Sequence, residues 1–242
     1  MLSEFEFGGS CPYSWYSDSP LSDWDGITLH SGVVFIDRLT VSGKMLRVSS
    51  IFLQNKRITS LPDSIGNLKS LLRLLVDGNN LTILPDSIGN LTSLVELDVK
   101  NNELAALPDS IGNLRSLDKL DVSNNLLSCL PDSIGNLKSL SQLWASFNRL
   151  THLPDCFGSL SHLTVIGVRN NRLDRLPECI ANLTSVVHLD IRNNQLTHIP
   201  ASVVNMSSLT NLWVSNNPVT STQEGRDDAK RRLERAGFDI YL

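Results

Sequence analysis

A unit of 23 residues repeats along most of this chain. Leu-Pro pairs begin at positions 61, 84, 107, 130, 153 and 176, Ile199-Pro200 follows, and neighbouring pairs are always 23 residues apart. A fixed spacing of this size is the signature of a solenoid, in which each copy is one structural unit stacked on its neighbours. A unit this short cannot bury its apolar residues alone, so the chain must fold as a continuous array.

Within each unit the apolar residues follow the pattern L-x-x-L-x-L-x-x-N-x-L-x-x-L-P. Its x-L-x-L-x segment alternates with a period of two, which is typical of a short strand with one buried face and one exposed face. The sequence therefore predicts one parallel sheet, to which each unit contributes one strand. We expect eight strand segments, which begin at Val48, Leu71, Leu94, Leu117, Leu140, Leu163, Val186 and Leu209.

An asparagine follows each strand segment from the second unit on, at the point where the chain must turn. A buried amide there can bond unpaired backbone groups of its own turn and of the neighbouring unit. Lys56 takes this place in the first unit, which has no preceding unit to bond. The predicted asparagine ladder consists of Asn79, Asn102, Asn125, Asn148, Asn171, Asn194 and Asn217.

The other half of each unit carries a return segment, Pro-Asp-Ser-Ile-Gly-Asn-Leu, which occurs in four identical copies. Proline is favoured where a short helical turn begins, and glycine where the backbone is tightly packed. We therefore expect short 3-10 or helical turns on the side opposite the sheet. The four copies begin at Pro62, Pro85, Pro108 and Pro131.

Over residues 48–219 this pattern resembles the leucine-rich repeat family. The resemblance implies an α/β solenoid with a curved parallel β-sheet on its concave side, short turns on its convex side, and caps at both ends. The 23-residue L-P-x-x-I-G-x-L form is similar to intracellular Ras-group scaffolds, their plant intracellular relatives and bacterial effectors injected into host cells. One segment, 24–29, instead resembles the W-x-G-I/V-x-C motif of plant receptor N-terminal caps, with Leu29 in place of the cysteine.

The two ends of the chain differ from the repeats. We expect residues 1–22 to form a flexible segment and residues 23–47 an N-terminal cap hairpin, in which 27–30 pairs with 33–41. The eight coils would occupy 48–219. Residues 220–242 would form a C-terminal cap, with a charged helix over 222–235 and a short strand in the last five residues.

Composition argues against several classes of function. The 21 Lys and Arg residues nearly balance the 25 Asp and Glu residues, and the formal net charge is −4, so neither nucleic acid nor an anionic membrane is an expected partner. With no apolar run of about 18 residues and no basic, apolar leader, we predict a cytoplasmic location, or the host cytosol for an injected effector.

The sequence holds no pattern typical of catalysis. None of its five histidines has a companion at metal-ligand or triad spacing, and no glycine-rich phosphate-binding motif follows a strand. We therefore predict no enzyme activity, no metal and no cofactor. Cys156 and Cys179 occupy equivalent places on neighbouring units, which leaves two alternatives: a disulfide, or two thiols that replace half-buried serines.

Function is expected on the concave face, where the residues between the strand leucines form columns. The middle column holds Asp98, Asp121, Trp144, Gly167 and Trp213, and a second holds Arg169 and Arg192. His188 lies in a third, and Arg149 and Arg172 lie in the turns that follow. Tryptophan and arginine are enriched at interface hot spots. The alternative is an ordinary polar sheet face whose tryptophans cover aliphatic neighbours.

These columns predict a partner of particular chemistry. Gly167 would leave a hollow beside the Trp144 ring for an apolar anchor, while the four arginines would bind carboxylates or phosphate. We predict a non-catalytic protein–protein interaction module, monomeric, in intracellular signalling or as an injected effector, with a small GTPase or another signalling protein as partner. The alternative is the substrate-recognition part of a ubiquitin ligase or other enzyme complex.

Overall fold

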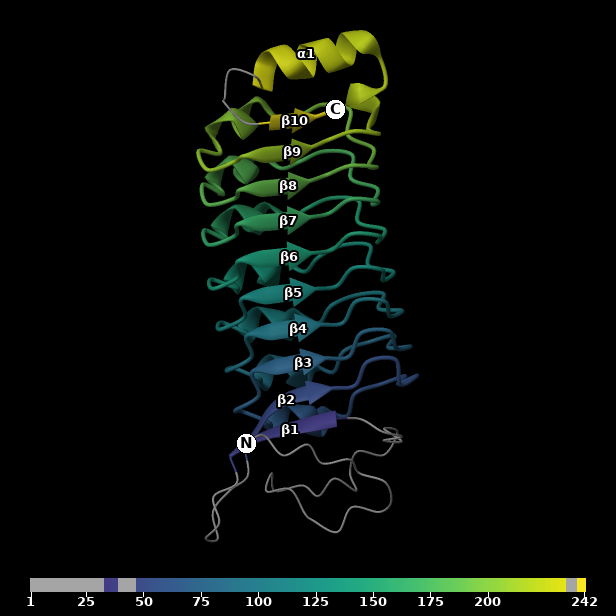
Figure 1. Ribbon diagram of the computed structural model, residues 1–242, viewed down its shortest axis with the longest axis vertical. Coiled ribbons are helices and arrows are strands. Elements are labelled where there is room, and N and C mark those ends of the chain that lie inside the picture. The colour runs from purple at the N-terminus through teal and green to yellow at the C-terminus, as the bar shows by residue number, and fades with distance from the viewer. Residues whose placement is uncertain (1–32, 39–46, 234–238) are drawn as a thin grey trace.

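The computed structural model describes residues 33–38, 47–233 and 239–242 of the chain. They form one sheet of ten strands, β1 to β10, whose order in the sheet is their order in the sequence (Figure 1). The predicted solenoid with a parallel sheet is confirmed. The ten strands are Val33–Arg38, Arg47–Phe52, Arg73–Leu75, Glu96–Asp98, Lys119–Asp121, Gln142–Trp144, Val165–Gly167, His188–Asp190, Asn211–Trp213 and Asp239–Tyr241.

Strands β2 to β9 are the eight repeat strands, and each pairs in parallel with the next. All use one register, in which Glu96 faces Lys119, Leu97 faces Leu120 and Asp98 faces Asp121. Because the register never slips, equivalent side chains of successive coils form straight columns. The central leucine or isoleucine of each strand points inward and is buried, while its two neighbours face outward.

Short 3-10 turns lie behind the sheet and complete each coil. Seven of them, η2 to η8, start directly after the proline of the return segment, as the sequence predicts. Their glycines pack closely: a Cβ atom on Gly112 would lie only 2.4 Å from the carbonyl oxygen of Ser133 in the next coil. The turns are Asp63–Asn67, Asp86–Asn90, Asp109–Asn113, Asp132–Asn136, Asp155–Ser159, Glu178–Asn182, Ala201–Asn205 and, as η9, Pro218–Thr220.

The asparagine ladder is present as predicted. The Asn125 side chain accepts a hydrogen bond from the Leu104 backbone N–H at 2.9 Å. It donates to the carbonyl oxygens of Val99 and Val122, both at 3.0 Å, and of Ser123 at 3.3 Å. Each ladder asparagine thus joins its own turn to the preceding coil. In the first coil, where Lys56 replaces asparagine, Asn79 accepts from the Lys56 backbone N–H.

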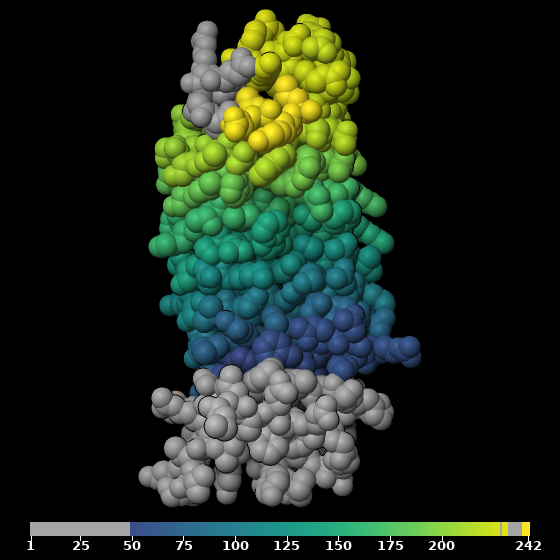
Figure 2. All heavy atoms as spheres, in the orientation of Figure 1, coloured from purple at the N-terminus to yellow at the C-terminus, as the bar shows by residue number. Residues whose placement is uncertain are grey.

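Additional strands lie at both ends of the repeat sheet. At the first end, β1 pairs antiparallel with β2 directly. At the other, the α1 helix, Gln223–Leu233, lies beyond the last coil, and β10 pairs in parallel with β9 (Figure 1). Figure 2 shows the coils as stacked bands with the C-terminal residues against the last of them. The predicted 27–30 strand and the predicted flexible segment 1–22 lie outside the described residues.

Candidate functional site

The exposed face of strands β3 to β9, which we call the sheet face, presents the columns singled out from the sequence. It has two parts of different chemistry. The acidic half, over β3 to β5, carries Asp98 and Asp121, and the aromatic half, over β6 to β9, carries Trp144 and Trp213. All the predicted site residues on the strands lie on this one face.

Charges in the acidic half are largely paired with one another. Asp98 is only 5% exposed; its Oδ2 lies 2.7 Å from Nζ of Lys100, whose backbone N–H donates to its Oδ1. On the neighbouring column, Glu96 pairs with Lys119 at 2.9 Å and with Arg73 at 3.7 Å. These pairs run along and between strands. They leave fewer free carboxylates than the sequence suggests.

Two carboxylates of the acidic half have raised pKa values. Burial raises the pKa of Asp121 above the usual aspartate range, although hydrogen bonds from Ser123 oppose the effect. Burial, followed by repulsion from Asp98, raises the pKa of Asp77. The hydrogen bond to Asp98 raises the pKa of Lys100, which stays protonated. The unpaired negative charge of this half is therefore concentrated on two destabilised carboxylates.

We expect Asp121→Asn to raise the melting temperature at pH 7. Because the folded-state pKa of Asp121 is raised, its charged form destabilises the fold at neutral pH, and stability recovers as pH falls through that pKa. The amide oxygen of asparagine can still accept the bond from the Ser123 N–H. Thermal unfolding from pH 7 to pH 4 should show the difference between variant and wild type shrinking; a constant difference would contradict the assignment.

The Trp144 ring lies close to Gly167 on the next strand. A Cβ atom added to Gly167 would lie 2.6 Å from Cε3 of this ring, so the indole occupies the space that glycine leaves. The predicted hollow beside Trp144 is therefore wrong. Instead of a pocket, Trp144 and Gly167 form a half-exposed apolar platform, with the indole N–H 3.5 Å from the Gln142 side-chain oxygen.

Trp213 has a different environment. Its ring stacks on Tyr241 of β10 at a centroid distance of 5.4 Å and lies 5.8 Å from the His188 ring. The Arg192 guanidinium lies over it, 5.9 Å from the ring centroid. Trp213 therefore links the last repeat strand to the C-terminal segment. The two tryptophans, equivalent in the sequence, differ in their structural roles.

Of the four predicted arginines, two have contacts within the fold and two are exposed in the turns. Arg192 forms two hydrogen bonds with the Asp190 carboxylate, at 2.9 and 2.7 Å, and Arg169 lies 5.1 Å above the Phe147 ring. Arg149 and Arg172 are exposed in the turns, and neither forms an ion pair within the part of the chain that the structure describes. Of the four predicted arginines, only these two have neither an ion pair nor a ring contact among the described residues.

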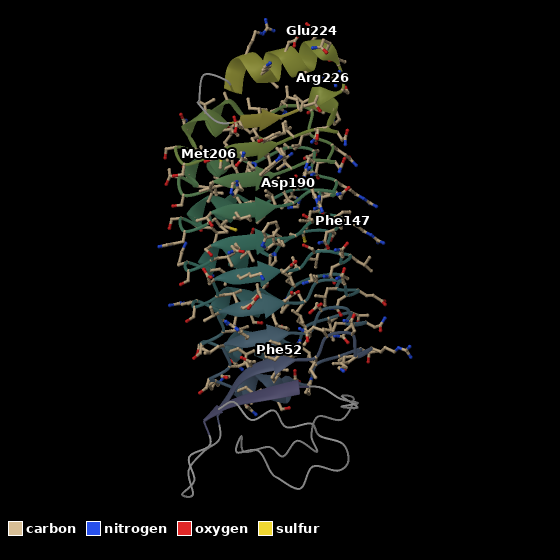
Figure 3. All side chains as sticks on the ribbon, in the orientation of Figure 1. Phe52, Phe147, Asp190, Met206, Glu224 and Arg226 are labelled. Atoms are coloured by element: carbon tan, nitrogen blue, oxygen red, sulfur yellow. The ribbon has the colours of Figure 1, made fainter. Side chains whose placement is uncertain are left out.

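Phe147 is a candidate site residue that sequence reasoning missed. It immediately precedes the ladder asparagine of its coil and has a φ angle of 57°, in the left-handed region. Its side chain is 43% exposed, at the edge of the solenoid (Figure 3). Bulky residues adopt this conformation rarely. Other coils use residues that tolerate it: Asn55, Gly78, Asn101, Asn124, Asn170, Asn193 and Asn216. That break in an otherwise regular column is visible in the sequence.

We expect Phe147→Asn to stabilise the fold by about 1 kcal/mol, because asparagine relieves a left-handed strain of that order. Phe147→Ala is the control, since alanine removes the ring but keeps the unfavourable backbone conformation. Urea denaturation should rank asparagine above phenylalanine and above alanine. Equal stability of the asparagine and alanine variants would show that the turn is not strained.

The cysteines of the described residues lie apart from the sheet-face columns. Cys156 and Cys179 are free thiols, and burial raises the pKa of each, so little thiolate forms at neutral pH. Across the described ranges, no three His, Cys, Asp or Glu side chains are grouped to hold a metal ion. Nor does any helix in those ranges have the length and apolar character needed to cross a membrane.

Comparison with known proteins agrees with the geometry. The family model described as a leucine-rich repeat region matches residues 38–150, and a second leucine-rich repeat model matches 146–196 and 161–219. A search of curated proteins finds no significant match.

Solved structures with the same architecture include a leucine-rich repeat protein of Leptospira interrogans, with 27% identity and a TM-score of 0.66 over 80% of this chain. The plant peptide hormone receptor RGFR1 in complex with RGF2 has 27% identity and a TM-score of 0.55 over 66% of the chain. PEPR1–AtPEP1 has 30% identity and a TM-score of 0.53 over 65%. This chain spans 54%, 30% and 26% of these three proteins, respectively. From its matching repeats, its unbroken parallel sheet and its asparagine ladder, the chain belongs to the leucine-rich repeat family.

Proposed function

We propose that this protein binds a protein or peptide partner through the aromatic half of the sheet face. The observation that carries the proposal is the Trp144–Gly167 platform. A large aromatic side chain, partly exposed, lies in the middle of the sheet, where its ring packs against a glycine of the next strand. A rigid, partly exposed tryptophan gives a large contact area at a small cost in conformational entropy.

The surroundings of the platform favour a ligand with negative charge. Arg149 and Arg172 lie in the turns that follow β6 and β7, and both are exposed. Guanidinium groups bind carboxylates with two parallel hydrogen bonds. The acidic half, by contrast, offers carboxylates already paired with lysine and arginine. A partner would therefore place its acidic residues over the aromatic half.

The solved relatives support a peptide or protein ligand. RGFR1 was solved with RGF2, and PEPR1 with AtPEP1. A role in intracellular signalling or as an injected effector, a small GTPase as partner and a cytoplasmic location stay predictions. The alternative is substrate recognition within a ubiquitin ligase or other enzyme complex. It would use the same surface, but the protein would also be bound to the other subunits of that complex.

Affinity purification from cells of the source organism, followed by quantitative mass spectrometry, tests the proposal. Wild-type protein and Trp144→Ala would be compared with Ile83→Ala, which removes another exposed apolar side chain, outside the sheet face. We expect proteins that are enriched on the wild type and on Ile83→Ala but lost on Trp144→Ala. Identical profiles for all three would contradict the proposal. Co-purified ligase subunits would favour the alternative, and a small GTPase the first prediction.

A further inference from the structure

We propose that the turn edge around Phe147 is a docking site for a linear peptide segment with an apolar side chain followed, within about three residues, by a carboxylate. We define the turn edge as Leu126, Phe147, Arg149, Arg169 and Arg172. It adjoins the Trp144 platform but is a separate set of contacts. This inference rests on the proposed function and specifies the ligand chemistry.

The Phe147 side chain lies at the surface and takes no part in the asparagine ladder. It is 43% exposed, and the ladder bonds of its coil are made by Asn148, not by Phe147. Its φ of 57° is shared by asparagines at the equivalent position of other coils, which fit that conformation better. A bulky aromatic kept in an unfavourable backbone conformation and exposed to solvent is typical of a functional contact.

The apolar surface continues onto the preceding coil. Leu126 lies in the turn of the fourth coil, directly after the ladder residue Asn125, and is 38% exposed. Phe147 occupies the turn of the fifth coil, immediately before Asn148. Neighbouring coils are joined through these turns, as in the bond from the Leu127 N–H to the Asn148 side chain. The two exposed apolar side chains therefore offer one contact region for a ligand's apolar residue.

Positive charge borders this region on the following coils. Arg169, which is half-buried, lies over the Phe147 ring at 5.1 Å and forms no ion pair among the described residues. Arg149 and Arg172, in the fifth and sixth coils, form no ion pair within the described ranges. The facing carboxylate in these turns is Asp174, two residues after Arg172 and likewise exposed. Three guanidinium groups against one carboxylate favour an acidic ligand.

Spacing along the stack sets the length of the ligand motif. Parallel strands lie about 4.8 Å apart, so the turns of the fourth and sixth coils are about 10 Å apart. An extended peptide advances about 3.3 Å per residue and covers that distance in three residues. Leu126 lies two coils from Arg172 and Phe147 lies one coil from it, so a peptide running along the turn edge can place an apolar side chain at Leu126 or Phe147 and a carboxylate at Arg172 within one to three residues.

Panning a phage-displayed library of random 12-residue peptides on the immobilised wild-type protein tests the inference. We expect the enriched peptides to share an apolar residue with Asp or Glu one to three positions later. Fluorescence anisotropy of the synthetic consensus peptide would then be measured with Phe147→Asn, with the double variant Arg149→Glu/Arg172→Glu, and with a charge-matched control, Arg115→Glu/Lys138→Glu. The control residues are exposed and lie between the 3-10 turns and the strands.

We expect at least a 10-fold weaker affinity for Phe147→Asn and for the double arginine variant, with less than a 2-fold change in the control. Because asparagine suits the turn, loss of binding by Phe147→Asn cannot be attributed to unfolding, and its melting temperature checks this. Unchanged affinity in Phe147→Asn, a consensus without acidic residues, or no enriched peptide would each overturn the inference. If Trp144→Ala abolishes binding and Phe147→Asn does not, the proposed function stands without this site.

Discussion

Asn125→Leu is expected to lower the free energy of unfolding by about 3 kcal/mol, since each buried backbone group left unpaired costs roughly 1–3 kcal/mol. Leucine has a similar volume but cannot replace the four hydrogen bonds of the Asn125 amide. The substitution leaves the Leu104 N–H and the Val99 carbonyl of the third coil, and the Val122 carbonyl of the fourth, without this partner. The damage therefore reaches two coils.

Thermal unfolding followed by circular dichroism would measure this effect, with a drop in melting temperature of about 6–12 °C expected for a chain of this size. Asn113→Leu is the matched control: Asn113 is exposed at the end of η4, and its side chain makes no hydrogen bond among the described residues. We expect the control to melt within about 2 °C of the wild type. Equal melting of both variants would mean that the ladder asparagines do not stabilise the turns.

The fold could be predicted because one pattern is repeated with no change of register. Each copy of x-L-x-L-x can bury its leucines only if the next copy lies alongside, so the period itself specifies a parallel array. The observed register, with Leu97 facing Leu120, follows directly. The ladder was also predictable, because a polar residue at an otherwise apolar position inside a turn needs backbone groups to bond.

The arrangement of side chains on the sheet face was harder to predict. Columns follow from the period, but the orientation of a ring does not: the Trp144 indole turns toward Gly167, because a residue without a side chain leaves room there. Ion pairs depend on the same rotamer choices. Arg192, predicted to face a ligand, instead bonds Asp190 two residues away on its own chain segment.

The pairing of the terminal strands could not be predicted from the repeat pattern either. Tyr241 takes the place beside Trp213 that the middle column of a ninth coil would hold, although the spacing of 23 residues has ended by then. The sequence shows an alternating C-terminal segment but not its register. That register places Tyr241 beside Trp213, so the two tryptophans, both half-buried, differ in what contacts them.

Trp144→Ala should weaken binding of the partner by about 2 kcal/mol, roughly 30-fold, as expected of a hot-spot tryptophan. The melting temperature should change little, because the ring lies on the surface and its contacts are with Gly167 and Gln142. Isothermal titration with a partner recovered by affinity purification measures the affinity, and calorimetric unfolding measures the melting temperature.

Trp213→Ala is the matched comparison. We expect it to lower the stability of the fold and to change partner affinity less than Trp144→Ala does. Trp213→Ala removes the stack on Tyr241, which packs β10 against β9, and also the contacts with His188 and Arg192. Loss of a large, partly buried aromatic side chain should cost about 2 kcal/mol of stability. Amide hydrogen exchange should quicken at Val214, whose N–H donates to the Tyr241 carbonyl. If Trp213→Ala weakens binding more than Trp144→Ala while stability is unchanged, the partner binds at the C-terminal end of the sheet face, and the assignment of the platform is wrong.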